Sequence, residues 1–243
     1  QQAMTYAQMM DLPFAYSSNG DAFYEHDFLT GQEQQIALEE FPTQEMLVAR
    51  YYAELHSGKG LSDMEKKIVS QPYYSSQSTY PPRYYQRNAV NRTVEAIARG
   101  QQRLLLVMAT GTGKTYTAFQ IVYRLLRSDL KKRILYLADR NILVDQSILQ
   151  DFAPLEKTIY KVDFSDKACL SKIASREVNF ALYHQMVGQN DEEHFKQIPA
   201  EYFDLIIVDE CHRGSAKEDS NWRKVLEYFS SATQIGMTAI PKE

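Results

Sequence analysis

Between Leu104 and Thr115 the sequence reads LLLVMATGTGKT, an aliphatic run that ends in a loop with two glycines, and a helical pattern follows at once. Buried parallel strands are nearly continuous aliphatic runs, and glycines let the backbone turn sharply so that several N–H groups point into one concavity. The first turn of the next helix adds the positive end of its dipole. The stretch therefore predicts a phosphate-binding loop between a core strand and a helix.

In a loop of this kind Lys114 reaches the β- and γ-phosphates of a nucleotide, and the Thr115 hydroxyl binds Mg²⁺. The general pattern G-x-x-x-x-G-K-[ST] has its first glycine where Met108 stands, so the usual small residue is missing from the first turn. The alternative interpretation is a glycine turn with a solvated lysine. The loop residues whose backbone would surround the phosphates are Thr110, Gly111, Thr112 and Gly113.

The composition is that of an ordinary globular protein. The chain has 243 residues, of which 44% are hydrophobic and 24% charged, enough for one large domain or for one domain and part of another. It contains no long apolar run and no signal-peptide pattern, so we expect a cytoplasmic location and no membrane partner. Cys169 and Cys211 do not form a CxxC pair, which argues against a disulfide framework or a zinc site.

The net charge of −4 is unevenly distributed along the chain. Residues 1–80 hold 4 Lys and Arg against 11 Asp and Glu, a net charge of −7, whereas residues 81–243 hold 23 against 20, a net charge of +3. The acidic balance therefore belongs to the N-terminal segment. The mildly positive remainder is compatible with contacts to a nucleic-acid backbone.

Local signals before Pro82 predict a few short elements and a linker. Because the chain does not begin with Met and its first residues look like the middle of a helix, we expect a fragment of a longer protein. Ser, Pro and Tyr between positions 70 and 82 are typical of a linker. The predicted elements are a strand at 11–16, its hairpin partner at 22–24, a helix after the N-cap Thr43 and a short helix near 62–69.

After Pro82, strands alternate with helices, and this pattern predicts an α/β fold with a parallel sheet covered by helices on both faces. A helix through Val90 and Ile97 should stop at Gly100. In such sheets ligands bind beyond the carboxyl ends of the strands. The predicted strands are 104–108, 133–138, 158–162, 179–183, 203–208 and 234–238, with helices at 118–126, 142–149 and 222–229.

Asp209 and Glu210 directly follow the apolar strand that ends at Val208. An Asp at a strand end can bind the Mg²⁺ that bridges the phosphates of ATP, and an adjacent Glu can polarise the attacking water. The alternative is a solvated strand terminus. With the phosphate loop, the pair predicts a site for ATP and Mg²⁺ in which Lys114, Asp209 and Glu210 are the catalytic residues.

Six segments of the chain match known motor motifs: 83–90, 108–115, 137–146, 181–186, the DExH box at 209–212, and 236–243. Together they make the chain resemble the R (restriction and translocation) subunit of type I restriction-modification enzymes, a superfamily 2 motor. The resemblance implies a RecA-like domain in which Gln86 reads adenine, Tyr183 and Gln185 lie along DNA, and His212 and Thr238 couple hydrolysis to movement. Ile240 departs from the usual T-A-T-P.

Gln2 and Tyr6 resemble the Q-x-x-x-Y element that follows the catalytic core of this family's nuclease domain. The alternative is an ordinary pair of polar residues on a helix. The metal-binding P-D…E-x-K residues are not in this sequence. The resemblance implies three parts: a nuclease remnant at 1–32, a helical connector at 33–81 and a RecA-like helicase or translocase domain at 82–243.

The same resemblance implies that the parent enzyme uses ATP to pump double-stranded DNA and then cleaves it, with modification and specificity subunits as partners. The second RecA-like domain and its arginine finger are not in this sequence, so hydrolysis by this chain alone is expected to be weak or absent. Two alternatives stay open: another superfamily 2 enzyme, such as a type III restriction subunit or a repair helicase, and a non-catalytic nucleotide-binding module.

A few further residues allow both a functional and an ordinary interpretation. Arg140, near a strand end, can contact a DNA phosphate or remain solvated. His184 and His194 lack metal-ligand spacing and are expected to be ordinary histidines. The tyrosines of the linker can stack on bases, but anchoring the linker is the simpler interpretation; they are Tyr73, Tyr74 and Tyr80.

Overall fold

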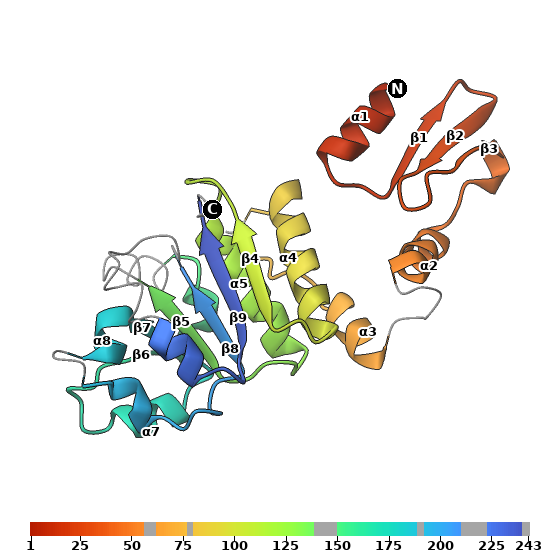
Figure 1. Ribbon diagram of the computed structural model, residues 1–243. Coiled ribbons are helices and arrows are strands. Elements are labelled where there is room, and N and C mark those ends of the chain that lie inside the picture. Colours follow the sequence, from red (N-terminus) through yellow and green to blue (C-terminus); the bar gives the residue numbers. More distant parts are fainter. Residues whose placement is uncertain (56–61, 77–79, 139–149, 189–191, 210–222, 240–243) are drawn as a thin grey trace. The chain divides into compact units, whose positions relative to one another are not determined.

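The computed structural model describes residues 1–55, 62–76, 80–138, 150–188, 192–209 and 223–239 (Figure 1). The chain divides into two compact units. The smaller unit comprises residues 1–66 and 83–88, and the larger unit comprises residues 67–82 and 89–243. Helices α3 (Asp63–Val69) and α4 (Tyr84–Ala98) contain residues of both units.

The smaller unit contains a three-stranded antiparallel sheet in the order β1-β2-β3. The predicted hairpin is confirmed, because Asn19 Oδ1 accepts hydrogen bonds from the N–H groups of Asp21 and Ala22 at 3.1 and 3.2 Å in the turn. The third strand was not predicted. The elements are α1 (Gln2–Met9), β1 (Phe14–Ser18), β2 (Ala22–Asp27), β3 (Glu33–Ala37), the 3-10 turn η1 (Leu38–Glu40) and α2 (Gln44–Leu55).

The larger unit contains a six-stranded parallel sheet in the order β4-β9-β8-β5-β7-β6, which confirms the predicted α/β fold. The strands are β4 (Arg103–Val107), β5 (Ile134–Ala138), β6 (Ile159–Lys161), β7 (Val178–Leu182), β8 (Leu205–Val208) and β9 (Thr233–Thr238). The helical elements include α5 (Lys114–Arg127), α7 (Cys169–Ala174), α8 (Tyr183–Val187), the 3-10 turns η2 (Ala153–Thr158) and η4 (His194–Gln197), and residues 223–228.

Each face of this sheet has its own apolar core, as the alternation of side chains along a strand requires. Along β5, Ile134 and Tyr136 pack with α4 and α5, whereas Leu135 and Leu137 pack with α7 and α8. The helices therefore cover both faces, as predicted. None of the helices in the described ranges has the length and apolar content needed to cross a membrane.

The prediction of a buried core strand at 104–108 is wrong for two of its five side chains, those of Leu105 and Val107. Among the described strands β4 lies at the edge of the sheet. Leu106 faces the core that α4 and α5 cover, but Leu105 and Val107 are 58% and 51% exposed. A continuous aliphatic run is typical of a buried strand, so the run alone did not reveal the edge position.

Arg124 of α5 anchors the segment that precedes α4. This buried guanidinium donates to the backbone carbonyls of Ile68 and Val69 at 3.0 and 3.3 Å and to Asn91 Oδ1 at 2.7 Å. It also lies over the Tyr73 ring, 5.1 Å from the centroid. One side chain thus holds two separate segments against the helix that follows the phosphate loop.

Gln120 and Tyr116 continue this anchoring along α5 at four-residue intervals. The Gln120 side chain accepts from the N–H of Tyr74 at 2.9 Å and donates to its carbonyl at 3.1 Å. The Tyr116 hydroxyl donates to the carbonyl of Tyr80 at 3.1 Å. Tyr74 packs against the core, so the anchoring interpretation is confirmed for this tyrosine; the Tyr80 side chain is exposed.

We expect Arg124→Ala to lower the free energy of unfolding by about 3 kcal/mol, because it leaves buried acceptors without their donor. Chemical denaturation followed by circular dichroism measures this change. The control is Arg127→Ala on the exposed side of the same helix, which should alter stability by less than about 0.5 kcal/mol. Equal stability of the two variants would contradict the anchoring role of Arg124.

Candidate functional site

The loop between β4 and α5 turns through two glycines with left-handed backbone. Gly111 has φ 78° and Gly113 has φ 80°, a region in which glycine is favoured over other residues. Gly113 is also the N-cap of α5, so it has no side chain to cover the first N–H groups of the helix. Thr110 is exposed and Thr115 is half-buried. Such a backbone is of the kind that turns successive N–H groups toward one concavity.

The Lys114 ammonium lies back over the loop. Its Nζ is 3.4 Å from the carbonyl oxygen of Met108, a long hydrogen bond, and the side chain is half-buried. Thr112 stabilises the turn, because its hydroxyl donates to the carbonyl of Ala109 at 2.6 Å. The loop is thus folded on itself with its cationic side chain across the strand end.

Met108, the departure from the common loop pattern, fits its position. The N–H of Met108 donates to the carbonyl of Thr238 at 2.8 Å, which extends the pairing of β4 with β9 by one residue. Its side chain is buried, and it is not among the described non-glycine residues with a positive φ. The backbone therefore does not require glycine here.

Asp209 lies at the end of β8 and is 6% exposed. Its N–H donates to the carbonyl of Leu137 at 2.9 Å, so the ladder with β5 continues through this residue. The Tyr136 hydroxyl donates to Oδ2 at 3.1 Å, and the Tyr183 hydroxyl donates to the backbone carbonyl of Asp209 at 3.0 Å. Burial, together with Asp209, raises the pKa of Tyr136 well above its ordinary value, so its hydroxyl remains a donor.

The parallel register brings the phosphate loop and Asp209 to the same edge of the sheet. Val107 of β4 and Val208 of β8 pair with Thr238 and Gly236 of the intervening β9. Strands two positions apart are separated by about 10 Å. Asp209 contacts Tyr136, which faces the core covered by α5. The carboxylate and the helix that begins at Lys114 are therefore on the same side of the sheet.

Thr238 is buried at the end of β9, the strand that lies between β4 with the phosphate loop and β8 with Asp209. Its carbonyl accepts from the Met108 N–H, so it is joined directly to the first residue of the loop. Three other predicted residues, Arg140, Glu210 and His212, lie outside the described residues.

Tyr183 and Gln185, predicted to lie along DNA, have contacts within the protein. Besides the bond from Tyr183 to Asp209, the Gln185 side chain accepts from the N–H of Leu182 at 3.2 Å and caps the start of α8. Gln86 makes a similar bond at the start of α4, accepting from the Arg83 N–H at 2.9 Å. This bond fits the ordinary interpretation of Gln86, a polar residue at a helix start, and adenine reading stays a prediction.

The remaining predicted residues have contacts typical of folded proteins. Gln2 Nε2 donates to the Tyr6 hydroxyl at 2.9 Å on the exposed side of α1, as the four-residue spacing predicts. His184 is exposed, and the His194 ring stacks on Phe164 at 5.2 Å. Within the described ranges, no group of three His, Cys, Asp or Glu side chains could hold a metal ion.

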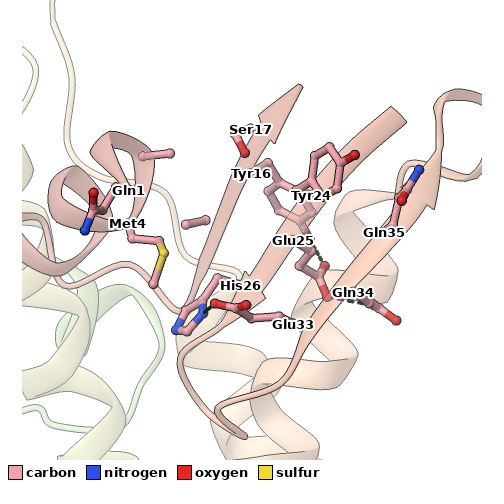
Figure 2. Close-up of a pocket in the computed structure, with 12 residues that line it drawn as sticks. Gln1, Met4, Tyr16, Ser17, Tyr24, Glu25, His26, Glu33, Gln34 and Gln35 are labelled. Carbon is pink, nitrogen blue, oxygen red and sulfur yellow. Dashed lines mark hydrogen bonds and ion pairs between the residues drawn. The ribbon is translucent and has the colours of Figure 1, made fainter. Parts of the chain in front are cut away.

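The smaller unit has a pocket of about 390 Å³ between α1 and its sheet. Figure 2 shows Met4 of α1 and the preceding Gln1 on one side, and Tyr24 of β2 and Gln35 of β3 on the other. His26 Nδ1 lies 2.9 Å from a carboxylate oxygen of Glu33. No sequence pattern predicts this pocket, because most of its lining residues come from four separate elements, α1, β1, β2 and β3.

Glu25, the buried acid of this pocket, is neutralised by Arg50. The guanidinium donates to both carboxylate oxygens at 2.9 and 2.8 Å, and Gln34 donates to one of them at 2.8 Å. The Tyr16 hydroxyl donates to the other. The hydrogen bonds from Arg50, helped by those of Tyr16 and Gln34, lower the pKa of Glu25 to about 2. This network stabilises the sheet and holds the acid ionised.

Comparison with known protein families identifies the family of this chain. A family profile described as "Type III restriction enzyme, res subunit" matches residues 79–243, which include the phosphate loop and Asp209. The chain belongs to this family.

Two curated relatives of this res-family chain are endonuclease subunits of type I restriction enzymes. The EcoAI endonuclease subunit from Escherichia coli is 48% identical, and the alignment covers 100% of the chain and 30% of the relative. The EcoKI endonuclease subunit from E. coli strain K12 is 31% identical, and the alignment covers 96% of the chain and 22% of the relative. The chain therefore spans less than a third of the length of these relatives.

A solved structure supports the same relationship to type I restriction enzymes. The fragment structure described as an HsdR subunit of a type I restriction enzyme from Vibrio vulnificus YJ016 is 38% identical, with a TM-score of 0.75; the match covers 100% of this res-family chain and 40% of that chain. The predicted resemblance to the R subunits of type I enzymes and the RecA-like parallel sheet are both confirmed.

We expect Glu25→Gln to destabilise the smaller unit by about 3 kcal/mol at pH 7, because Arg50 loses its bidentate carboxylate partner and keeps only the ion pair with Asp27 at 2.8 Å. The pKa of Glu25 is lower in the folded state than its ordinary value of 4.5. Its contribution is therefore full above pH 4.5 and is lost as the pH falls through about 2. Hydrogen exchange of the β2 amides, measured from pH 7 down to 2, reports this stability.

The control for this prediction is Glu33→Gln, which changes a more exposed carboxylate of the same sheet and should leave the acid dependence intact. In Glu25→Gln, the part of the acid destabilisation that falls between pH 4.5 and 2 should shrink. An unchanged pH profile in Glu25→Gln would show that this carboxylate does not stabilise the folded state.

Proposed function

We propose that this chain is the ATP-binding motor part of a type I restriction endonuclease subunit and that it contacts double-stranded DNA. The observation that carries the proposal is the common edge at which β4 delivers the phosphate loop and β8 delivers Asp209. Support comes from relatives that are endonuclease subunits of type I restriction enzymes.

The residues at this edge fit a magnesium-bound triphosphate. The left-handed Gly111 and Gly113 allow the loop to wrap around phosphates, and Lys114 supplies the positive charge. The Thr115 hydroxyl and the Asp209 carboxylate are the hard oxygen ligands that Mg²⁺ prefers.

Each residue has a distinct role in this proposal. The amides of residues 110–113 and Lys114 hold the phosphates, Thr115 and Asp209 hold the metal, and Glu210 accepts a proton from the attacking water. When bound, ATP supplies the phosphoanhydride that is cleaved, and Mg²⁺ neutralises charge on its phosphates. Gln86 contacts the adenine, and His212 and Thr238 link the nucleotide to DNA movement.

The proposed roles of the other parts of the chain are those implied by its resemblance to the R subunits of type I enzymes. Residues 1–32 are the end of a nuclease domain that includes Gln2 and Tyr6, residues 33–81 are a connector, and residues 82–243 are the first RecA-like domain. Arg140, Tyr183 and Gln185 contact DNA. In this proposal the whole enzyme is an ATP-dependent deoxyribonuclease that works in the cytoplasm with modification and specificity subunits.

We expect Lys114→Ala to weaken binding of a fluorescent ATP analogue in Mg²⁺ by about 10- to 100-fold, because a hydrogen bond to a charged phosphate contributes about 1.5–3 kcal/mol. A fluorescence titration of the full 243-residue chain measures the affinity. The control is Lys132→Ala, another lysine of the larger unit whose side chain is 65% exposed.

The titration, followed by an ATPase assay with DNA on the whole enzyme, distinguishes a motor from a non-catalytic nucleotide-binding module. Loss of DNA-stimulated hydrolysis in Lys114→Ala supports a motor. Nucleotide binding without hydrolysis by the unmodified whole enzyme would favour a non-catalytic binding module. If Lys114→Ala and Lys132→Ala bind the analogue equally well, the loop is not the nucleotide site.

A further inference from the structure

Tyr136 is held rigidly in the middle of β5. It is 1% exposed. Its ring stacks on Phe180 of the neighbouring β7, with centroids 4.7 Å apart and planes inclined by 25°, and it meets Phe152 edge-on at 5.7 Å. A side chain packed between two aromatic rings has little rotational freedom. The position of its hydroxyl is therefore fixed by the core and not by solvent.

The hydroxyl of this buried ring reaches the edge of the sheet. Tyr136 pairs in register with Ile207, so it lies two residues before the level of Asp209 on the adjacent strand. Two residues of a strand span about 7 Å, which a tyrosine side chain that leans along the strand can cover. The hydroxyl donates to Oδ2 of Asp209 at 3.1 Å. The packing of the Tyr136 ring in the core thereby fixes the position of the hydroxyl that binds the Asp209 carboxylate.

The backbone of Asp209 is fixed separately. Its N–H donates to Leu137 of the ladder, and its carbonyl accepts from the Tyr183 hydroxyl. These two bonds involve only the backbone of Asp209, so they locate its Cα and not its carboxylate. A carboxylate has two oxygens with about four acceptor positions. The bond from Tyr136 occupies one position on Oδ2 and so selects one orientation of the group.

We propose that Tyr136 is a positioning residue for the metal ligand Asp209. Its hydroxyl holds Oδ2 on the β5 side of β8 and so fixes the orientation of the carboxylate before nucleotide and Mg²⁺ arrive. This inference rests on the proposed function, because it requires Asp209 to bind the metal. Hydrogen-bond partners of metal ligands have this effect generally, and their removal typically lowers metal affinity by about 10- to 100-fold.

Tyr136→Phe tests the inference, since it removes the hydroxyl and keeps the ring that stacks on Phe180. Affinity for a fluorescent ATP analogue is measured on the full chain twice, in excess Mg²⁺ and in EDTA. The affinity in EDTA should stay within about twofold of the parent protein. The affinity in Mg²⁺ should fall by about 10-fold, and the Mg²⁺ concentration for half-maximal binding should rise by a similar factor.

The matched control is Tyr202→Phe. This change also removes one tyrosine hydroxyl, which donates to the carbonyl of Ile173 at 3.1 Å. Tyr202 precedes β8, at the end of the strand opposite to Asp209. Both variants should unfold cooperatively, and only Tyr136→Phe should change the Mg²⁺-dependent part of binding.

A double-mutant cycle shows whether Tyr136 acts through Asp209. In an Asp209→Asn background the Mg²⁺-dependent gain in affinity should be small, and adding Tyr136→Phe should change it no further. An additional loss in that background would overturn the positioning role.

The remaining outcomes separate the two proposals. If Tyr136→Phe keeps the full Mg²⁺-dependent gain while Lys114→Ala loses nucleotide binding, the positioning role is wrong and the proposed function stands. If the parent protein binds the analogue equally in Mg²⁺ and in EDTA, Asp209 does not hold a nucleotide-bound metal, and both proposals fail.

Discussion

The site depends on the hydrogen-bonded register of three parallel strands. β9 lies between β4 and β8 and pairs with both, so the residues that follow these two strands end at the same edge of the sheet. Two backbone bonds carry the ladder beyond the strand ends, from Met108 to Thr238 and from Asp209 to Leu137. The phosphate loop and the carboxylate thereby gain a fixed separation, although 94 residues lie between Lys114 and Asp209.

Features that follow from local chemistry or from the periodicity of apolar residues could be predicted from the sequence. The alternation of strands and helices predicted the parallel sheet, the two glycines after the aliphatic run predicted a loop before a helix, and the two short strands near the N-terminus predicted the hairpin. The placement of Lys114 and Asp209 at one edge also followed, because all carboxyl ends of a parallel sheet lie together.

Contacts between distant segments could not be predicted in this way. Nothing in the sequence pairs Tyr136 with Asp209, because a tyrosine in an aliphatic strand looks like any core residue. Arg124 and Arg50 look like solvated arginines until the segments they anchor are folded against them. The exposed face of β4 was missed for a related reason, since strand order is a property of the whole sheet.

A crystal structure of the protein with Mg²⁺ and a non-hydrolysable ATP analogue tests the central claim most directly. The account predicts the β- and γ-phosphates against the backbone of residues 109–114 and the Lys114 ammonium, with the metal between the Thr115 hydroxyl and the Asp209 carboxylate. Phosphates bound elsewhere, or an Asp209 carboxylate turned away from the metal, would contradict it.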